Sequence, residues 1–409
     1  MRSLRKDFSL SALIAGFIAV MVSYAGPLAV VIEAARAAHM SDGQVSSWLW
    51  AISIGSGITG VLLSIYTRTP VIIAWSTPGA ALLITALPNY VYPEAVGAYV
   101  ACALLITIFG VTGLFSSLIS KIPAGIVGAM LAGILFKFGA GVFTAIKDWP
   151  GLVVPLVVSF YCAKKWLPRY AVVVTLVLGV LLCWGGGKLD LSTLRPSIAV
   201  PVLTMPKFSL EALIGLGLPL FLVTMTSQNA TGLGVMKAAG YQARGNLLVT
   251  STGIASLLLA PFGCHAINLA AITAAICTGP ESNQDPDRRY VAGIACGGFY
   301  ILIGLFGLTV ASAFAALPGS LVSTIAGLAL LGALMTGLST AMGDERTREG
   351  ALVTFIIAAS GVSFYGIGAP FWGLVGGMLV HGLLALRLRA AAEKSLGAAP
   401  RKLMPSAQK

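Results

Sequence analysis

The sequence predicts an all-α polytopic membrane protein, and its composition and long uncharged stretches carry that prediction. Hydrophobic residues make up 57% of the chain and charged residues only 10%, whereas a soluble domain carries about 25% charged residues. Residues 8–32 and 290–343 contain no Asp, Glu, Lys or Arg, and each helical crossing needs about 20 apolar residues. Runs of this length are also too long for the strands of a membrane β-barrel.

Short motifs from the first half of the chain recur in the second half, mostly about 195 positions later, which indicates an internal repeat. The matching pairs are "SGITGVLLS" (56–64) with "TGIASLLLA" (252–260), "IPAGIVGAMLAG" (122–133) with "LPGSLVSTIAGL" (317–328), and, at a slightly smaller offset, "ALLITA" (81–86) with "LAAITA" (269–274). We therefore expect two halves of similar fold.

The apolar segments divide into seven spans in each half. The expected spans are 12–33, 45–65, 70–87, 95–118, 122–142, 149–165, 168–187, 210–236, 246–262, 264–278, 290–313, 317–339, 348–365 and 368–387. Because seven is odd, the second half must be inverted relative to the first. Inverted repeats are typical of secondary transporters, whose binding sites lie near the middle of the membrane.

Basic residues predict the orientation of these spans. With the N-terminus in the cytoplasm, most of the 26 Lys and Arg residues lie at cytoplasmic ends, as expected for a bacterial inner-membrane protein with both termini inside. The formal charge of +12 therefore indicates membrane topology, and we expect no nucleic-acid partner. The basic N-terminus precedes a long apolar span with no evident cleavage site, so no signal peptide is expected.

A Thr-Pro-Gly break interrupts the third span in "AWSTPGAALLITA" (74–86). The β-branched residues before the break can cross half of the membrane in extended form, and a helix of about ten residues covers the other half. Pro78 and Gly79 suit a helix start that Ser76 or Thr77 can cap. An ordinary helix kinked at Pro78 is the alternative.

The tenth span is expected to contain a matching break in "PFGCHAINLAAITA" (261–274), with a second half-helix starting at Cys264–His265. Two half-helix N-termini that face each other would form an anion site, because each has free N–H groups and about half a positive charge. His265 is the plausibly titrating group near the middle of the membrane, and a simple polar cap is its alternative role.

The eighth span contains a third polar break in "TMTSQNATGLG" (224–234), matched by "SYAGPLAVV" (23–31) in the first span. Amides such as Gln228 and Asn229 are costly in lipid unless they face the bundle interior, although hydrogen bonding between helices also explains them. Tyr24 is either a packing residue or a ligand for an aromatic guest. The six cysteines lie in apolar segments without metal-ligand spacing, so no metal is expected.

"WSTPGAALLITALPNY", "TSQNATGLGVMKAAGY" and "PFGCHAINLAAITAAICTG" resemble the benzoate:proton symporter family of bacterial inner membranes over essentially the whole chain. That family is similar in fold to nucleobase symporters and sulfate permeases, which implies core and gate domains in each repeat. The implied divisions are 1–120 (core), 121–208 (gate), 209–316 (core), 317–390 (gate) and a disordered cytoplasmic tail, 391–409. Acidic residues of the nucleobase relatives correspond here to Gln228 and His265, which suits a carboxylate substrate.

The resemblance and the breaks together predict a secondary transporter that imports benzoate or a related aromatic carboxylate together with protons. The residues expected at the substrate are Tyr24, Ser76, Thr77, Pro78, Gly79, Gln228, Asn229, Cys264, His265 and Asn268, with His265 also carrying the proton. We expect no enzymatic activity and no cofactor. The partners expected are the substrate, protons, the lipid bilayer and a second copy in a possible homodimer. A proton-coupled or exchange transporter of another small anion or a nucleobase is the alternative.

Overall fold

The computed structural model describes residues 7–114, 123–189, 192, 194, 196–270, 272–280, 282–362, 364 and 369–397. The first half contains α2 (Leu10–Ala25), α3 (Pro27–Ala37), α4 (Asp42–Thr67), β1 (Ile73–Trp75), α5 (Thr77–Ala86), α6 (Tyr92–Thr112), α8 (Ala124–Thr144), α9 (Pro150–Trp166) and α10 (Ala171–Gly185). The second half contains α11 (Leu210–Ala212), η4 (Leu213–Gly217), α12 (Leu218–Val223), η5 (Thr224–Asn229), α13 (Ala230–Ala238), α14 (Gly245–Leu259), β2 (Ile267–Leu269), α15 (Ile272–Thr278), α16 (Tyr290–Leu305), α17 (Gly307–Ala315), α18 (Gly319–Gly343), α19 (Arg348–Ser360) and α20 (Ala369–Gly397).

The helical membrane class predicted from the sequence is confirmed. Seven helices of the described chain are long and apolar enough to cross a membrane, or eight if the pair formed by Pro286–Leu305 and α17 counts as one span. That pair is bent by 71°, so the single span expected over 290–313 is not straight. Other expected spans correspond to shorter helices or to strand–helix segments, and the number fourteen stays a prediction. Because α20 continues to Gly397, residues 391–397 of the expected disordered tail are helical, and 398–409 lie outside the described residues.

Two short strands pair antiparallel in the interior. Ile73 lies opposite Leu269 and Trp75 opposite Ile267, and both strands are fully buried. Irregular backbone is tolerated at membrane depth only where its polar groups are satisfied inside the protein. The pairing supplies those partners, and it also brings the ends of the two strand–helix segments together.

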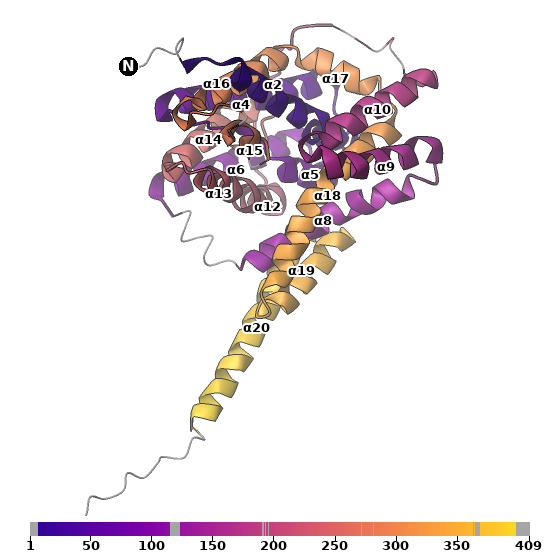
Figure 1. The fold of residues 1–409 in the computed structure, drawn as a ribbon. Helices are drawn as coiled ribbons and strands as arrows, with labels where there is room; N and C mark the ends of the chain where they lie inside the picture. The colour runs from indigo at the N-terminus through magenta and orange to yellow at the C-terminus, as the bar shows by residue number, and fades with distance from the viewer. Residues whose placement is uncertain are drawn as a thin grey trace, which may run out of the picture.

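Glycine allows the closest helix contacts. A side chain at Gly337 of α18 would lie 2.8 Å from the carbonyl oxygen of Gly128 on α8, and one at Gly57 of α4 would lie 2.6 Å from that of Gly297 on α16. Small residues let helix backbones approach in this way. Figure 1 shows α8, α18, α19 and α20 extending away from the packed body that contains α2, α4, α5, α6 and α12.

An ion pair and side-chain hydrogen bonds identify the two ends of the helix bundle. At one end the carboxylate of Asp7 accepts a hydrogen bond from the hydroxyl of Tyr290 at 2.9 Å and forms an ion pair with Arg68 at 3.5 Å. At the other end the guanidinium of Arg36 donates to the carbonyl of Phe314 at 3.1 Å. We call these the Asp7 end and the Arg36 end. Arg68 and Arg288 both lie at Asp7, so the positive-inside rule predicts that the Asp7 end is cytoplasmic.

Candidate functional site

In the first strand–helix segment, β1 ends at Trp75 and α5 begins at Thr77, as the sequence predicts. Ser76 is the N-cap, and its Oγ accepts a hydrogen bond from the N–H of Gly79 at 3.1 Å. The N–H of Ala80 donates to the Ser76 carbonyl at 2.8 Å, and Pro78 has no N–H. These bonds leave Thr77 as the first-turn residue with an unused N–H. Attraction of an anion to this tip therefore depends mainly on the helix dipole.

The second half-helix starts later than expected. α15 begins at Ile272, whereas Cys264 and His265 precede β2, so the expected helix start at these residues is wrong. The offset of the longer repeat motifs, about 195 residues, pairs Thr77 with Ile272. The shorter "LAAITA" match has a smaller offset, and it therefore places the expected helix start several residues too early. Because β1 and β2 pair antiparallel, His265 instead lies beside the end of β1.

His265 has a partner on each ring nitrogen. The indole Nε1–H of Trp48, on α4, donates to Nδ1 at 3.0 Å, and Nε2 lies 3.0 Å from the carbonyl oxygen of Ser76. The rings of Trp48 and His265 meet edge to face, with centroids 5.5 Å apart. Both residues are completely buried. The imidazole therefore joins α4, the start of β2 and the cap of α5.

The two predicted asparagines bond to backbone groups of the site. The Oδ1 of Asn229 accepts from the N–H of Leu269 at 3.0 Å, and its Nδ2 lies 3.3 Å from the sulfur of Met225. With its amide turned so that both atoms find partners, Asn268 accepts from the N–H of Ser76 at 2.8 Å and donates to the carbonyl of Leu269 at 3.0 Å. The same Ser76 N–H also donates to the Ala266 carbonyl at 3.1 Å. Both asparagines are completely buried, and these bonds hold β2 against η5 and β1.

Tyr24 lies in an aromatic cluster beside β1. Its ring packs edge to face on Trp75, with centroids 5.4 Å apart, and lies 6.0 Å from the ring of Tyr300. Its hydroxyl is hydrogen-bonded to Ser53 on α4. These contacts are those of a packing residue, and a ligand role for Tyr24 stays a prediction.

The polar break expected at residues 224–234 is wrong, because the helix runs without interruption from Leu210 to Lys237. Its polar stretch forms the π-helical segment η5, which keeps backbone hydrogen bonds while adding a residue to the turn. The hydroxyls of Thr226 and Ser227 donate to carbonyls one turn earlier, on Leu222 and Val223.

A cavity of about 430 Å³ lies where α5 and η5 approach α8 and α18. It is lined by Pro78, Ala124, Val127, Gly128, Leu131, Leu222, Met225, Thr226, Ser227, Gln228, Ala230, Thr231, Gly332, Ala333, Thr336, Gly337 and Thr340. Small-molecule sites are commonly of this size and mostly apolar with a few polar groups. Of the predicted site residues, Pro78 and Gln228 line it, whereas the asparagines and His265 do not.

The packing of α18 shows which half of the protein contains the cavity. Side chains built at Gly26 and Gly319 would contact Ala329 and Arg36, respectively, so α18 runs antiparallel to α3 from the Arg36 end. Residues 332–340 of the cavity wall therefore lie beyond the level of Gly26, toward the Asp7 end. At the Arg36 end α3 and α18 remain in contact, since Ser323 donates to the Glu33 carboxylate at 3.1 Å.

Comparison with known proteins decides the family. Residues 6–383 match the family model described as benzoate membrane transport protein. The chain belongs to the benzoate membrane transport protein family. It is 42% identical over 384 residues to the benzoate membrane transport protein of Acinetobacter baylyi, covering 94% of this chain and 98% of that protein. It is also 40% identical to the inner membrane protein YdcO of Escherichia coli, covering 91% of this chain and 96% of YdcO.

Solved structures of similar fold are anion transporters. The transmembrane domain of the cyanobacterial bicarbonate transporter BicA matches with a TM-score of 0.57 and 16% identity, covering 92% of this chain and 97% of that one. SLC26A9 matches with a TM-score of 0.60 and 14% identity, covering 94% of this chain and 66% of that one. These likenesses show a shared fold, and membership of a family of membrane transport proteins makes this chain a multi-pass membrane transporter and not an enzyme.

Sequence reasoning missed the α8 and α18 side of the cavity in this family member. Gly128, Thr336, Gly337 and Thr340 all line it. The runs "GAMLAG" (128–133) and "AGLALLGALMTG" (326–337) contain three of these four residues, and small residues in such runs by themselves predict only close helix contact. Packing does explain Gly128 and Gly337, and the cavity adds a second reason for small residues here.

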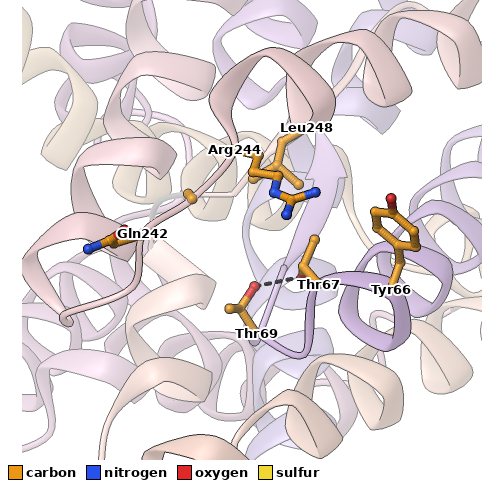
Figure 2. Close-up of a pocket in the computed structure, with 7 residues that line it drawn as sticks. Tyr66, Thr67, Thr69, Gln242, Arg244 and Leu248 are labelled. Carbon is orange, nitrogen blue, oxygen red and sulfur yellow. Dashed lines mark hydrogen bonds between the residues drawn. The ribbon is translucent and has the colours of Figure 1, made fainter.

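A second, polar pocket of about 320 Å³ lies at the Asp7 end (Figure 2). It is lined by Tyr66, Thr67, Thr69, Gln242, Ala243, Arg244 and Leu248. Thr67 and Thr69 are hydrogen-bonded to each other at 2.7 Å. None of the predicted site residues lines this pocket, and three of its lining residues, Tyr66, Gln242 and Arg244, are exposed, so the cavity at α5 is the better candidate site.

Proposed function

We propose that this protein imports benzoate or a related aromatic carboxylate, together with a proton, across the bacterial inner membrane. Membership of the benzoate membrane transport protein family supports the substrate class. YdcO, named as an inner membrane protein, supports the location. The apolar cavity at the tip of α5 supports a small aromatic guest.

The observation that carries this proposal is that Gln228 and Pro78 line the same cavity. The threonine and serine hydroxyls of η5 donate to their own helix, and the hydrogen bonds among the described residues leave the Gln228 amide unused. An N–H₂ donor beside a helix N-terminus can bind a carboxylate without a fixed positive charge. Val127, Leu131 and Met225 then provide apolar walls for the ring.

Coupling to a proton follows from the cost of moving an anion into a negative cell. Each negative charge costs about 2.3 kcal/mol per 100 mV of membrane potential. One proton moving with one carboxylate cancels that charge, and the pH gradient then drives accumulation. Alternating access would come from movement of the α5 and η5 side of the cavity against α8 and α18.

Uptake into proteoliposomes tests this function. With an acidic outside and the membrane potential clamped at zero, labelled benzoate should accumulate, and a protonophore should abolish accumulation. Uracil, bicarbonate and sulfate serve as competitors for the alternative substrates. Benzoate uptake that ignores the pH gradient would contradict symport, and stronger competition by uracil or an inorganic anion than by hydroxybenzoates would contradict the substrate class.

A further inference from the structure

The tautomer of His265 follows from its partners. An indole N–H can only donate a hydrogen bond, so the Nδ1 atom that Trp48 contacts must be the unprotonated acceptor. The Nε2 atom therefore has the hydrogen, and it donates to the carbonyl oxygen of Ser76. A proton added to Nδ1 would point at the Trp48 N–H and would break that bond inside a fully buried site.

Among the residues that the structure describes, none offers the ring a charged partner. Trp48 and Tyr99 face it edge to face, with centroids 5.5 and 6.5 Å away. The described titratable groups around it are its chain neighbour Cys264 and three residues of α6, Tyr92, Tyr99 and Cys102, of which Tyr92 and Cys102 lie close to Cys264. All of these groups are neutral in their ordinary protonation states near pH 7.

Ser76 connects this histidine to the cavity. Its carbonyl is bonded to His265, its N–H donates to the Ala266 carbonyl at 3.1 Å, and its Oγ caps α5. The hydroxyl of Thr224 in η5 also donates to that Oγ at 2.9 Å. A displacement at His265 therefore moves the two elements that present Pro78 and Gln228 to the cavity.

We propose that His265 is a positioning residue, held between Trp48 and the Ser76 carbonyl as the neutral Nε2–H tautomer, and is not the carrier of the co-transported proton. This inference rests on the proposed function for its link to transport, and it reverses the role that the sequence favoured. Its task is to hold the N-cap of α5 in register with η5, so that the carboxylate site keeps its shape.

Two substitutions separate the positioning role from a proton-carrying role. A glutamine at this position has both an acceptor and an N–H donor but cannot titrate, so His265→Gln should retain pH-gradient-driven benzoate uptake with the pH profile of the parent. His265→Ala should raise KM by about fivefold or more, because it leaves buried partners unpaired. His381→Gln, in α20, is the matched control. Loss of gradient dependence in His265→Gln with the control intact would overturn the proposal.

Nitrogen NMR tests the tautomer without using transport. The chain contains three histidines, so ¹⁵N-histidine labelling of a His39→Gln, His381→Gln variant in nanodiscs reports on His265 alone. We expect one Nδ1 acceptor signal and one Nε2–H signal, unchanged from about pH 8 to about pH 5, a range that spans ordinary imidazole titration. An Nδ1–H tautomer or an imidazolium signal within that range would overturn the proposal, even if the substrate proved to be another compound.

Discussion

Gln228 is the residue on which recognition of a carboxylate depends most directly in this account. It lies in the π-helical segment η5 and lines the cavity with Pro78. The sequence could identify it, because an amide within an apolar span is costly unless it faces the interior. The sequence could not separate it from Asn229, because only the fold shows that the Asn229 side chain is bonded to the backbone of β2.

Substitution of Gln228 tests this assignment. Gln228→Ala should weaken benzoate binding by about ten- to a hundredfold, because a hydrogen bond to a charged group contributes about 1.5–3 kcal/mol. Gln228→Glu should weaken it further, since a fixed carboxylate repels an anionic substrate. Isothermal titration calorimetry in detergent measures both. Gln242→Glu, which adds the same charge in the other pocket, should bind as the parent does, and equal binding by Gln228→Glu would refute the role.

Among the elements, the strand–helix segments show what a sequence can and cannot predict. The first segment follows from local chemistry, since Ser76, Pro78 and Gly79 together indicate a capped helix start. The start of α15 at Ile272 has no such punctuation, and the residues that resemble a break, Pro261 and Gly263, end the preceding helix instead. Its position depends on long-range pairing with β1, which local patterns do not contain.

The polar stretch of η5 predicts a helix break that the folded chain does not have, for a related reason. Serine, threonine and asparagine favour turns and caps in isolation, so the sequence suggested a break. In the folded chain the hydroxyls of Thr226 and Ser227 donate to carbonyls of the same helix, and the helix continues as a π-helical turn.

Packing of α8 against α18 makes an element-scale prediction. Gly337→Ala should destabilise the protein by about 1–3 kcal/mol, because its new methyl group would approach the Gly128 carbonyl and overpack the contact. Gly332→Ala is the matched control, since Gly332 lines the same cavity and a side chain built there meets nothing within 4 Å. Thermal unfolding in detergent compares them. Equal melting temperatures would show that the helices are not in this close contact.

For the whole molecule, the cavity lies in the half nearer the Asp7 end, while α3 and α18 pack together at the Arg36 end. The sequence predicted the membrane class and the family from composition and motifs. It did not predict which helices face each other across the cavity, because helix pairing in lipid depends on small-residue contacts between segments far apart in the chain.

Accessibility of the cavity tests its orientation. In a Cys162→Ser background, which removes the exposed native cysteine, Thr340→Cys should react with a membrane-impermeant maleimide in inside-out vesicles and not in right-side-out vesicles. This follows because the positive-inside rule makes the Asp7 end cytoplasmic. Benzoate should slow the reaction. Labelling from the periplasmic side alone would mean that the topology or the position of the cavity is incorrect.

The most direct measurement is a crystal structure of the protein with 4-bromobenzoate, in which anomalous scattering locates the bromine. The account predicts one bromine inside the cavity between α5, η5, α8 and α18, with the carboxylate within hydrogen-bonding distance of the Gln228 amide. A bromine bound only in the Arg244 pocket, or a carboxylate turned away from both Gln228 and the tip of α5, would contradict the account.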